Sequence, residues 1–396
     1  MKIIISIAAI FVFISVLSYD AYAIPAFARQ YKLSCQTCHA PVPKLKAFGD
    51  EFAGNGFVLE DKENSRYFVE TGDQELSLIR DFPVAVRFDL VGSYNTANKK
   101  KGDFGTPYNL KFLSGGSLAK DISYYFYFFF SERGEVAGVE DAYIMFNNIF
   151  GVDLDLYIGQ FQTSDPLFKR EIRLTFEDYD IYKAKIGLNH ANLTYDRGLM
   201  LTLGLETGTD IILEAVNGSG IGAADELKLF DDDDNKNFMA RISQSFGDFL
   251  RVGAFGYLGQ QYMTNDVTKV NSDFLMAGPD ATISFGDFAE LNLQYVIRND
   301  DEALLSQSDN AMNEIKTQGG FAELIITPKG DQSKQYGVLL FNYVDSDFTK
   351  LNKKSATVHL GHVFRRNIRF FTEYTYTEDE ELGKYGKFNV GIVSAF

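Results

Sequence analysis

The chain has 396 residues with 54 acidic and 38 basic side chains, which gives a formal net charge of −16. A chain this acidic is unsuited to binding nucleic acid, and its length allows either two or three ordinary domains or one large barrel. Phenylalanine and tyrosine are abundant, with 36 and 22 residues, whereas tryptophan is absent and there are only two cysteines.

Residues 1–23 have the pattern of a secretory signal peptide. Lys2 supplies the positive start, residues 3–17 are apolar, and Ala21-Tyr22-Ala23 offers the small residues that a signal peptidase requires. We expect the mature protein to begin at Ile24. The apolar run is shorter than the ~20 residues of a membrane helix, so an uncleaved anchor is the less favoured alternative.

The run Cys35-Gln36-Thr37-Cys38-His39 is the C-x-x-C-H pattern of a c-type haem attachment site. Each thiol can bond to one vinyl carbon of the haem, and His39 is then placed to be the proximal ligand of the iron. A disulfide would leave the adjacent histidine unexplained, and a zinc site needs two more ligands nearby, whereas the next histidine is His190. We therefore predict one covalent haem c, bound by Cys35, Cys38 and His39, with His39 as the iron ligand.

Residues 24–80 are predicted to form a short helical cytochrome segment around this motif. Leu45, Phe48 and Phe52 recur at helical spacing and could cover one face of the haem. No histidine or methionine lies between positions 40 and 80, so the distal position is open, is filled by an unusual ligand such as a lysine, or is supplied by a later residue. The conventional candidates are the later methionines and the histidines at positions 190, 359 and 362.

Residues 81–396 alternate apolar and polar side chains with a period of two, which predicts an all-β domain. We expect sixteen strands, at 82–95, 108–119, 122–132, 138–147, 153–162, 198–206, 210–217, 237–246, 249–263, 271–285, 288–299, 316–327, 334–345, 354–364, 368–378 and 386–396. The stretch 163–197 is open: it is either an inward-folded loop or two further strands.

Two architectures fit this alternation. A soluble sandwich would turn its apolar face inward. Tight turns on one rim, long loops on the other, an even number of strands and the terminal Phe396 favour instead an antiparallel transmembrane β-barrel in the bacterial outer membrane, with its apolar face in contact with lipid. Because the cytochrome segment is too short to bury much surface alone, we expect it to lie within the mouth or lumen of this barrel.

About thirty residues resemble the start of the fused monohaem cytochrome–porin proteins of iron-oxidising bacteria, on the motifs Phe27-Ala28-Arg29, Ser34 to His39, Pro43, Leu45, Phe48-Gly49, Phe52 and Asn55-Gly56. The resemblance implies an outer-membrane electron conduit that takes electrons from an extracellular donor, expected to be Fe(II), and passes them to a periplasmic cytochrome. It implies an electron-transfer protein, in enzyme terms an Fe(II):cytochrome c oxidoreductase, with no catalytic side chains beyond the haem site.

Two other functions compete with this one. In the first, the barrel is a diffusion porin and the haem-bearing segment is a periplasmic accessory. In the second, the barrel is a sleeve around a separate multihaem cytochrome.

Overall fold

The computed structural model describes residues 26–396 except 60–68, 70–71, 74–75, 77, 80–81, 98, 100, 133–134, 136–137, 188, 232, 265–268 and 305–313. The predicted signal peptide, residues 1–23, lies outside the described residues. The helices are α2 (Ala26–Tyr31), α3 (Cys35–Cys38) and α4 (Ala47–Gly54), and short 3-10 turns include η3 (Arg170–Ile172) and η4 (Asp180–Lys183). No helix in the described part of the chain is long and apolar enough to span a membrane.

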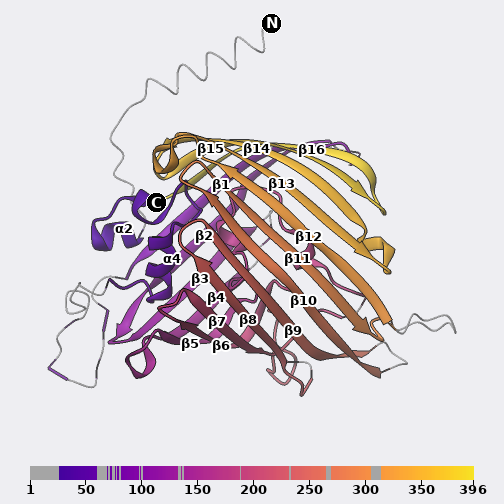
Figure 1. The fold of residues 1–396 in the computed structure, drawn as a ribbon, viewed down its shortest axis with the longest axis horizontal. Helices are drawn as coiled ribbons and strands as arrows, with labels where there is room; N and C mark the ends of the chain where they lie inside the picture. Colours follow the sequence, from indigo (N-terminus) through magenta and orange to yellow (C-terminus); the bar gives the residue numbers. More distant parts are fainter. Residues whose placement is uncertain are drawn as a thin grey trace, which may run out of the picture.

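Sixteen antiparallel strands close into one barrel in which each strand pairs with its sequence neighbours and β1 pairs with β16 (Figure 1). The strands are β1 (Val84–Asn95), β2 (Gly102–Ala119), β3 (Ile122–Glu132), β4 (Gly138–Phe146), β5 (Leu154–Gln162), β6 (Tyr195–Gly204), β7 (Thr209–Val216), β8 (Asn237–Phe246), β9 (Leu250–Thr264), β10 (Lys269–Phe285), β11 (Ala289–Asp301), β12 (Glu314–Ile326), β13 (Gln335–Ser346), β14 (Lys353–Arg365), β15 (Ile368–Asp379) and β16 (Gly383–Ala395). Both the fold class and the strand number predicted from the sequence are confirmed.

The barrel wall is apolar outside and polar inside. On β14, Leu360 faces outward and is 60% exposed, whereas its neighbour His359 faces inward and is 1% exposed. Large apolar side chains are likewise exposed around most of the barrel, and several aromatic ones gather at the tight turns: Phe150, Phe246, Phe249, Phe285 and Phe288. Because the sheet is closed, the backbone of every strand has a hydrogen-bonded neighbour on both edges. The apolar outer face is suited to contact with the hydrocarbon of the bilayer. The predicted outer-membrane location and contact with lipid are confirmed.

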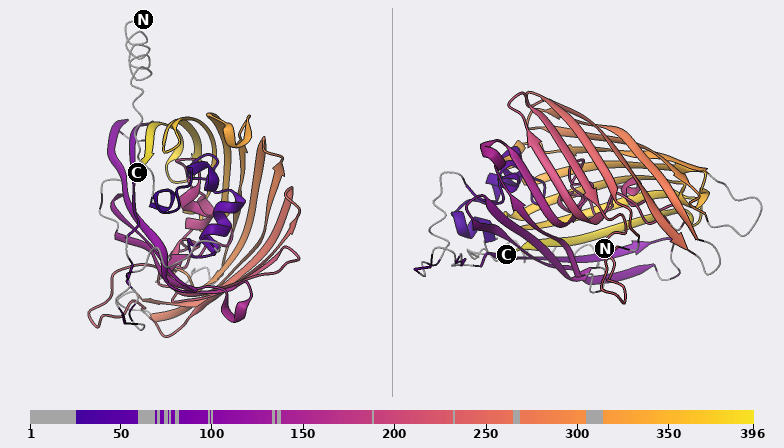
Figure 2. Two further views of the ribbon diagram at one scale, coloured as in Figure 1. Left: turned by 90° about the vertical axis from the view of Figure 1, so that its left-hand side faces the viewer. Right: turned by 90° about the horizontal axis from the view of Figure 1, so that it is seen from below.

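The tight turns and both ends of the barrel sequence lie on one rim. The turns at 120–121, 147–153, 205–208, 247–249, 286–288, 327–334 and 366–367 connect strands there, next to the start of β1 and the end of β16. The three longest connections, 163–194, 217–236 and 302–313, belong to the opposite rim. In outer-membrane barrels the short turns face the periplasm, so the helices of the N-terminal segment lie at the periplasmic rim (Figure 2).

Residues 163–194 form no strand and fold into the lumen, where they make the 3-10 turns η3 and η4. We call this stretch the inner loop. It resolves the alternative that the sequence left open, in favour of an inward-folded loop. Among the described residues, the inner loop and residues 26–59 of the N-terminal segment lie inside the barrel.

Candidate functional site

The C-x-x-C-H motif forms a single helical turn that brings its three functional side chains together. Ser34 caps α3 by accepting a hydrogen bond from the backbone N–H of Gln36 at 3.4 Å, and the N–H of His39 donates to the carbonyl of Cys35 at 2.9 Å. Both thiols are free and half-buried, and burial raises the pKa of Cys35 and of Cys38. One turn therefore offers two thiols and an imidazole, which is the donor set that covalent haem attachment requires.

His39 is held by the loop that follows it. Its Nδ1 atom lies 2.9 Å from the carbonyl oxygen of Pro43. Because a carbonyl oxygen can only accept, Nδ1 carries the proton, and in the neutral ring the lone pair is left on Nε2. Burial lowers the pKa of His39, which favours the neutral ring. An imidazole anchored by one nitrogen to a backbone carbonyl is the usual support of a histidine metal ligand, so the residues fit a haem iron at Nε2.

Residues 26–59 belong to the predicted cytochrome segment, a name kept below for this part of the chain, and they are held together by close helix contact and a small aromatic core. A Cβ atom at Gly49 of α4 would lie 2.3 Å from the carbonyl oxygen of Cys38, so only glycine allows α4 to approach the haem motif this closely. Phe52 is buried and lies in edge contact with Phe27, and Phe57 stacks on Phe27 at 4.7 Å. A helix forms at Phe48 and Phe52 as predicted, but Leu45 precedes it and forms a β-bridge with His39. Phe52 belongs to the segment's own core, and Phe48 is the more exposed ring beside it.

Ion pairs attach this segment to the inside of the barrel mouth. Lys44 pairs with Glu290 at the start of β11 at 2.9 Å, and Lys46 pairs with Asp331 in the turn between β12 and β13. On the far side, Asp50 lies 3.3 Å from Lys169 of the inner loop. The helices accordingly lie inside the ring of strands (Figure 2, left). The expectation that the segment occupies the barrel mouth is confirmed for residues 26–59.

Close packing completes the attachment along β3 and β4. The side chain of Asn147 donates to the carbonyl of Gly54 at 3.1 Å, and Phe57 stacks on Tyr125 of β3 at 5.0 Å. Tyr125 is the first of a run of inward rings on β3, followed by Tyr127 at 6.5 Å and then Phe129 at 5.4 Å from Tyr127. The aromatic residues of β3 therefore meet the cytochrome segment at one end and continue into the lumen.

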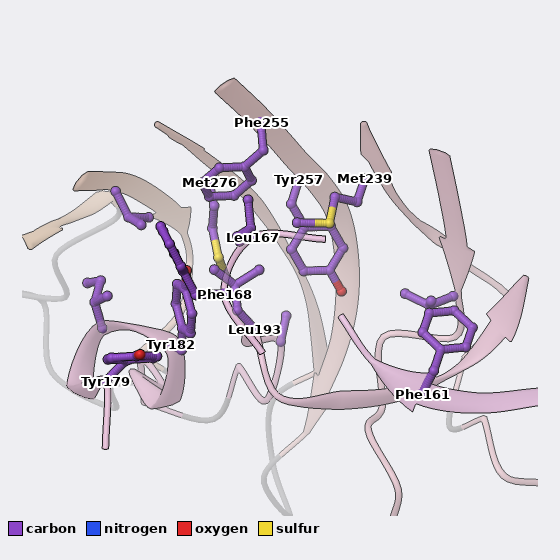
Figure 3. Packing of buried hydrophobic residues seen from close by; sticks show 14 of the residues in the cluster. Phe161, Leu167, Phe168, Tyr179, Tyr182, Leu193, Met239, Phe255, Tyr257 and Met276 are labelled. Atoms are coloured by element: carbon purple, nitrogen blue, oxygen red, sulfur yellow. The ribbon is translucent and has the colours of Figure 1, made fainter. Parts of the chain in front are cut away.

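The inner loop packs against the far wall through a large apolar cluster. Tyr179 stacks on Phe321 of β12 with ring centroids 3.9 Å apart. Figure 3 shows loop residues facing strand residues in this cluster, among them Leu167, Phe168, Leu193, Phe255, Tyr257 and Met276. Arg298 of β11 anchors the loop by donating to the carbonyls of Ala184 and Ala191 at 2.9 and 2.7 Å. The inner loop thus occupies the side of the lumen next to these strands, where the packing is apolar.

Charges within the inner loop are arranged around one carboxylate. Asp178 pairs with Arg170 at 2.6 Å, with Lys183 at 3.4 Å and with Arg173 at 3.6 Å. Burial alone would raise the pKa of Asp178, but these three cations outweigh it and hold the pKa well below its usual range. The loop is therefore fixed internally by a fully ionised cluster.

Two neighbouring cavities lie between the barrel wall and the parts of the chain inside it. The larger lies in the lumen between residues 170–176 of the loop and the wall of β1, β2, β15 and β16. The smaller lies at the periplasmic rim between Val42 and Pro43 of the cytochrome segment and the ends of β14, β15 and β16. Arg87, Arg369 and Val393 line both cavities, so the space next to the loop that supports His39 adjoins the lumen.

The three histidines considered as distal ligands lie in different places. His190 is exposed at the end of the inner loop, and its backbone N–H donates to Gln261. His362 contacts Gln335 at 3.3 Å on β14. His359 is buried in the lumen wall, where it binds Glu373 at 2.8 Å and lies near Tyr336. His359 is thus the one of these three on the inner wall, but it already has a carboxylate partner.

Sequence reasoning missed the two arginines that line both cavities, Arg87 and Arg369. A signal was present in the strand pattern. Arg87 and Arg298 each have an aspartate two residues later on the same face of the strand, and both form ion pairs with it. Arg369 has Phe371 at that position instead. An inward arginine without this partner could have been recognised as unusual.

No known family matches the chain, and no curated protein matches it either. Solved structures of outer-membrane barrels do match. OmpT of Vibrio cholerae is 13% identical over 80% of this chain and 99% of its own, with a TM-score of 0.55, and OprB of Pseudomonas putida is 12% identical over 80% and 94%, also with 0.55. An anion-selective porin from Comamonas acidovorans is 14% identical over 80% and 99%, with 0.53. The chain therefore has the fold of outer-membrane porins, with its N-terminal C-x-x-C-H turn placed at the mouth of the barrel.

Proposed function

We propose that the protein is an outer-membrane electron conduit that carries a single covalent haem c at the periplasmic mouth of the barrel. It takes electrons from an extracellular donor, for which Fe(II) is the expected ion, and passes them to a periplasmic cytochrome. The observation that carries the proposal is the position of the C-x-x-C-H turn, which is fastened into the mouth by Lys44–Glu290 and Lys46–Asp331. A haem in this position faces the periplasm on one side and the lumen on the other.

Each residue of the site has a separate task in this proposal. When bound, haem c supplies a one-electron couple at its iron. Cys35 and Cys38 fix the haem to α3, His39 offers Nε2 to the iron, and Pro43 fixes the ring of His39 through Nδ1. The barrel residues around the mouth limit contact with water. No side chain needs to exchange a proton or form a bond during outer-sphere electron transfer.

The partly occupied lumen supports the conduit proposal. The lumen of a porin is polar and water-filled. Here the inner loop packs on inward Phe255, Tyr257, Phe274 and Met276, and the cytochrome segment lies across the mouth. A separate multihaem cytochrome would have to displace both the loop and the segment. The inward rings of β3, from Tyr125 to Phe129, also replace water with packed side chains along part of the path.

The test uses the purified full-length protein in liposomes. Absorbance spectra before and after adding Fe(II) outside the liposomes should show reduction of a covalent haem, and planar bilayers should show little conductance. A Cys35→Ala/Cys38→Ala variant is the control and should show no haem band. A haem that Fe(II) leaves oxidised, together with a large steady conductance, would favour the diffusion porin. A second haem protein that co-purifies would favour the sleeve.

A further inference from the structure

The two cavities described above meet at Arg369 of β15. This side chain is 5% exposed, and it donates from Nη1 to the carbonyl of Leu174 at 3.1 Å and to the hydroxyl of Tyr336. Its Nε atom is buried without a hydrogen-bond partner. A buried donor left without a partner costs free energy, and more so when it is charged, so such a group marks a position where an acceptor belongs.

Among the cations that line the cavities and are not exposed, charge pairing singles out the same residue. Arg87 pairs with Asp89 at 2.8 Å, and Lys111 pairs with Glu171. Arg170 and Arg173 share Asp178. Within the described part of the chain, Arg369 has no carboxylate at ion-pair distance: its two acceptors are neutral oxygens. A buried guanidinium next to a cavity and without an anion is complementary to a carboxylate or another oxyanion.

The wall of the smaller cavity also points to one source of such an anion. Pro43, whose carbonyl holds the ring of His39, lines the smaller cavity together with Arg369, Arg366 and Arg87. A haem attached at Cys35, Cys38 and His39 carries two propionate carboxylates on its rim. We propose that Arg369 binds a haem propionate, so that the barrel wall and not only the cytochrome segment holds the cofactor. This inference rests on the proposed function.

The test compares Arg369→Gln with a matched control in the full-length haem protein. Arg251 of β9 is the control, because its Nε is also buried without a partner but it lines neither cavity. Removing a cation beside a propionate favours the oxidised haem, so Arg369→Gln should lower the reduction midpoint potential and shift the propionate bending band in resonance Raman spectra. Arg251→Gln should leave the propionate band unchanged. The haem content of each variant is measured after denaturation, and only variants with equal haem content are compared, so that differences in haem loading cannot cause the shifts.

A second variant, Arg369→Lys, keeps the test possible if Arg369→Gln does not fold. If Arg369→Gln lacks the heat-dependent gel migration of a folded barrel, Arg369→Lys keeps the charge and removes the guanidinium fork. It should shift the propionate band while the midpoint potential stays close to that of the wild type. An unchanged band in every folded variant would overturn the proposal.

A separate arm distinguishes a haem propionate from a free anion. The haem-free Cys35→Ala/Cys38→Ala protein is titrated with acetate, with and without Arg369→Gln. Stabilisation by acetate that depends on Arg369, combined with an unchanged potential in the haem protein, would assign the site to a free oxyanion and overturn the haem assignment. Absence of covalent haem from the wild type would instead refute the proposed function itself.

Discussion

Lys44 of the cytochrome segment and Glu290 of β11 form an ion pair of 2.9 Å whose side chains are 22% and 25% exposed. The pair joins a segment near the start of the chain to the inside of a strand in its second half. It lies across the mouth from the Phe57–Tyr125 contact, so the segment is fastened on both sides. This arrangement leads to the first prediction.

We expect Lys44→Glu to loosen the cytochrome segment, because two carboxylates would then face each other in a half-buried position, at a cost of about 1–2 kcal/mol. Trypsin should cleave the segment at Arg29 and Lys32 faster in this variant. The exchange Lys44→Glu/Glu290→Lys should restore the slower cleavage. Lys384→Glu is the control, since the exposed pair of Lys384 with Glu378 involves no part of the segment. Equal cleavage in all variants would contradict the docking role.

The second prediction concerns haem attachment. Cys35→Ala/Cys38→Ala should abolish haem staining after denaturing electrophoresis of protein made in an exporting host that matures cytochromes c. Thr37→Ala, inside the same turn, should keep it, because the threonine supplies neither a thioether nor an iron ligand. Staining of the double variant as strong as that of the wild type would mean that this turn does not bind haem covalently.

The third prediction concerns the inner loop. Phe321→Ala removes the ring that stacks on Tyr179, and truncating a buried phenylalanine costs about 3–5 kcal/mol. We expect the loop to leave the wall, so that single-channel conductance in planar bilayers rises severalfold. Phe341→Ala, at an outward position on β13, is the control and should conduct like the wild type. A wild-type protein that already conducts as well as Phe321→Ala would show that the loop does not close the lumen.

The fourth prediction is a pH dependence set by Asp165 of the inner loop. Burial raises the pKa of Asp165 from 3.8 to about 6, against an opposing effect of Lys169. The folded pKa is the higher one, so the ionised carboxylate destabilises the fold above pH 6, and this cost disappears as the pH falls towards 3.8. Asp165→Asn should therefore stabilise the protein at pH 7.5, by about 1–2 kcal/mol, and have no effect at pH 4.

Glu171 provides the contrast for the same experiment. Burial would raise its pKa, but Lys111 and Arg173 outweigh it and lower the pKa to about 2. Its contribution is fully present above pH 4.5 and is lost only as the pH falls through 2. Glu171→Gln should therefore destabilise the protein at both pH 7.5 and pH 4. Urea unfolding followed by circular dichroism measures both variants, and an Asp165→Asn effect that is the same at the two pH values would contradict the assignment.

Much of the barrel could be predicted because its strands and turns are indicated by residues that are close together in the sequence. An alternation of period two and turn residues such as Gly286-Asp287 place a strand without knowledge of its partners. The largest error is the start of β2, at Gly102 and not at 108, because Gly105 and Pro107 suggest a loop. Those residues are in the strand because they pair with the end of β1, as in Val91↔Gly105. Register with a neighbour outweighs local propensity there.

In the candidate site, too, some residues could be predicted from a local motif and others depend on contacts between distant parts of the chain. Cys35, Cys38 and His39 are adjacent in sequence, so their chemistry is legible in the motif. The position of the inner loop depends on contacts such as Tyr179 with Phe321, which no local pattern encodes. Arg369 could be predicted only in part: Phe371 stands where two other inward arginines have an aspartate, but the importance of Arg369 comes from a cavity that the whole barrel creates.

The contact between Asp50 and Lys169 has a thermodynamic consequence. It joins the cytochrome segment to the inner loop at 3.3 Å, and both side chains are partly exposed, so it contributes about 1 kcal/mol at most. Coupling free energies are reciprocal. The free energy that this contact adds to the binding of the segment at the periplasmic mouth is therefore also added to the binding of the inner loop to the barrel wall. An event at one end therefore shifts the equilibrium at the other by up to about fivefold, without any displacement of the strands between them.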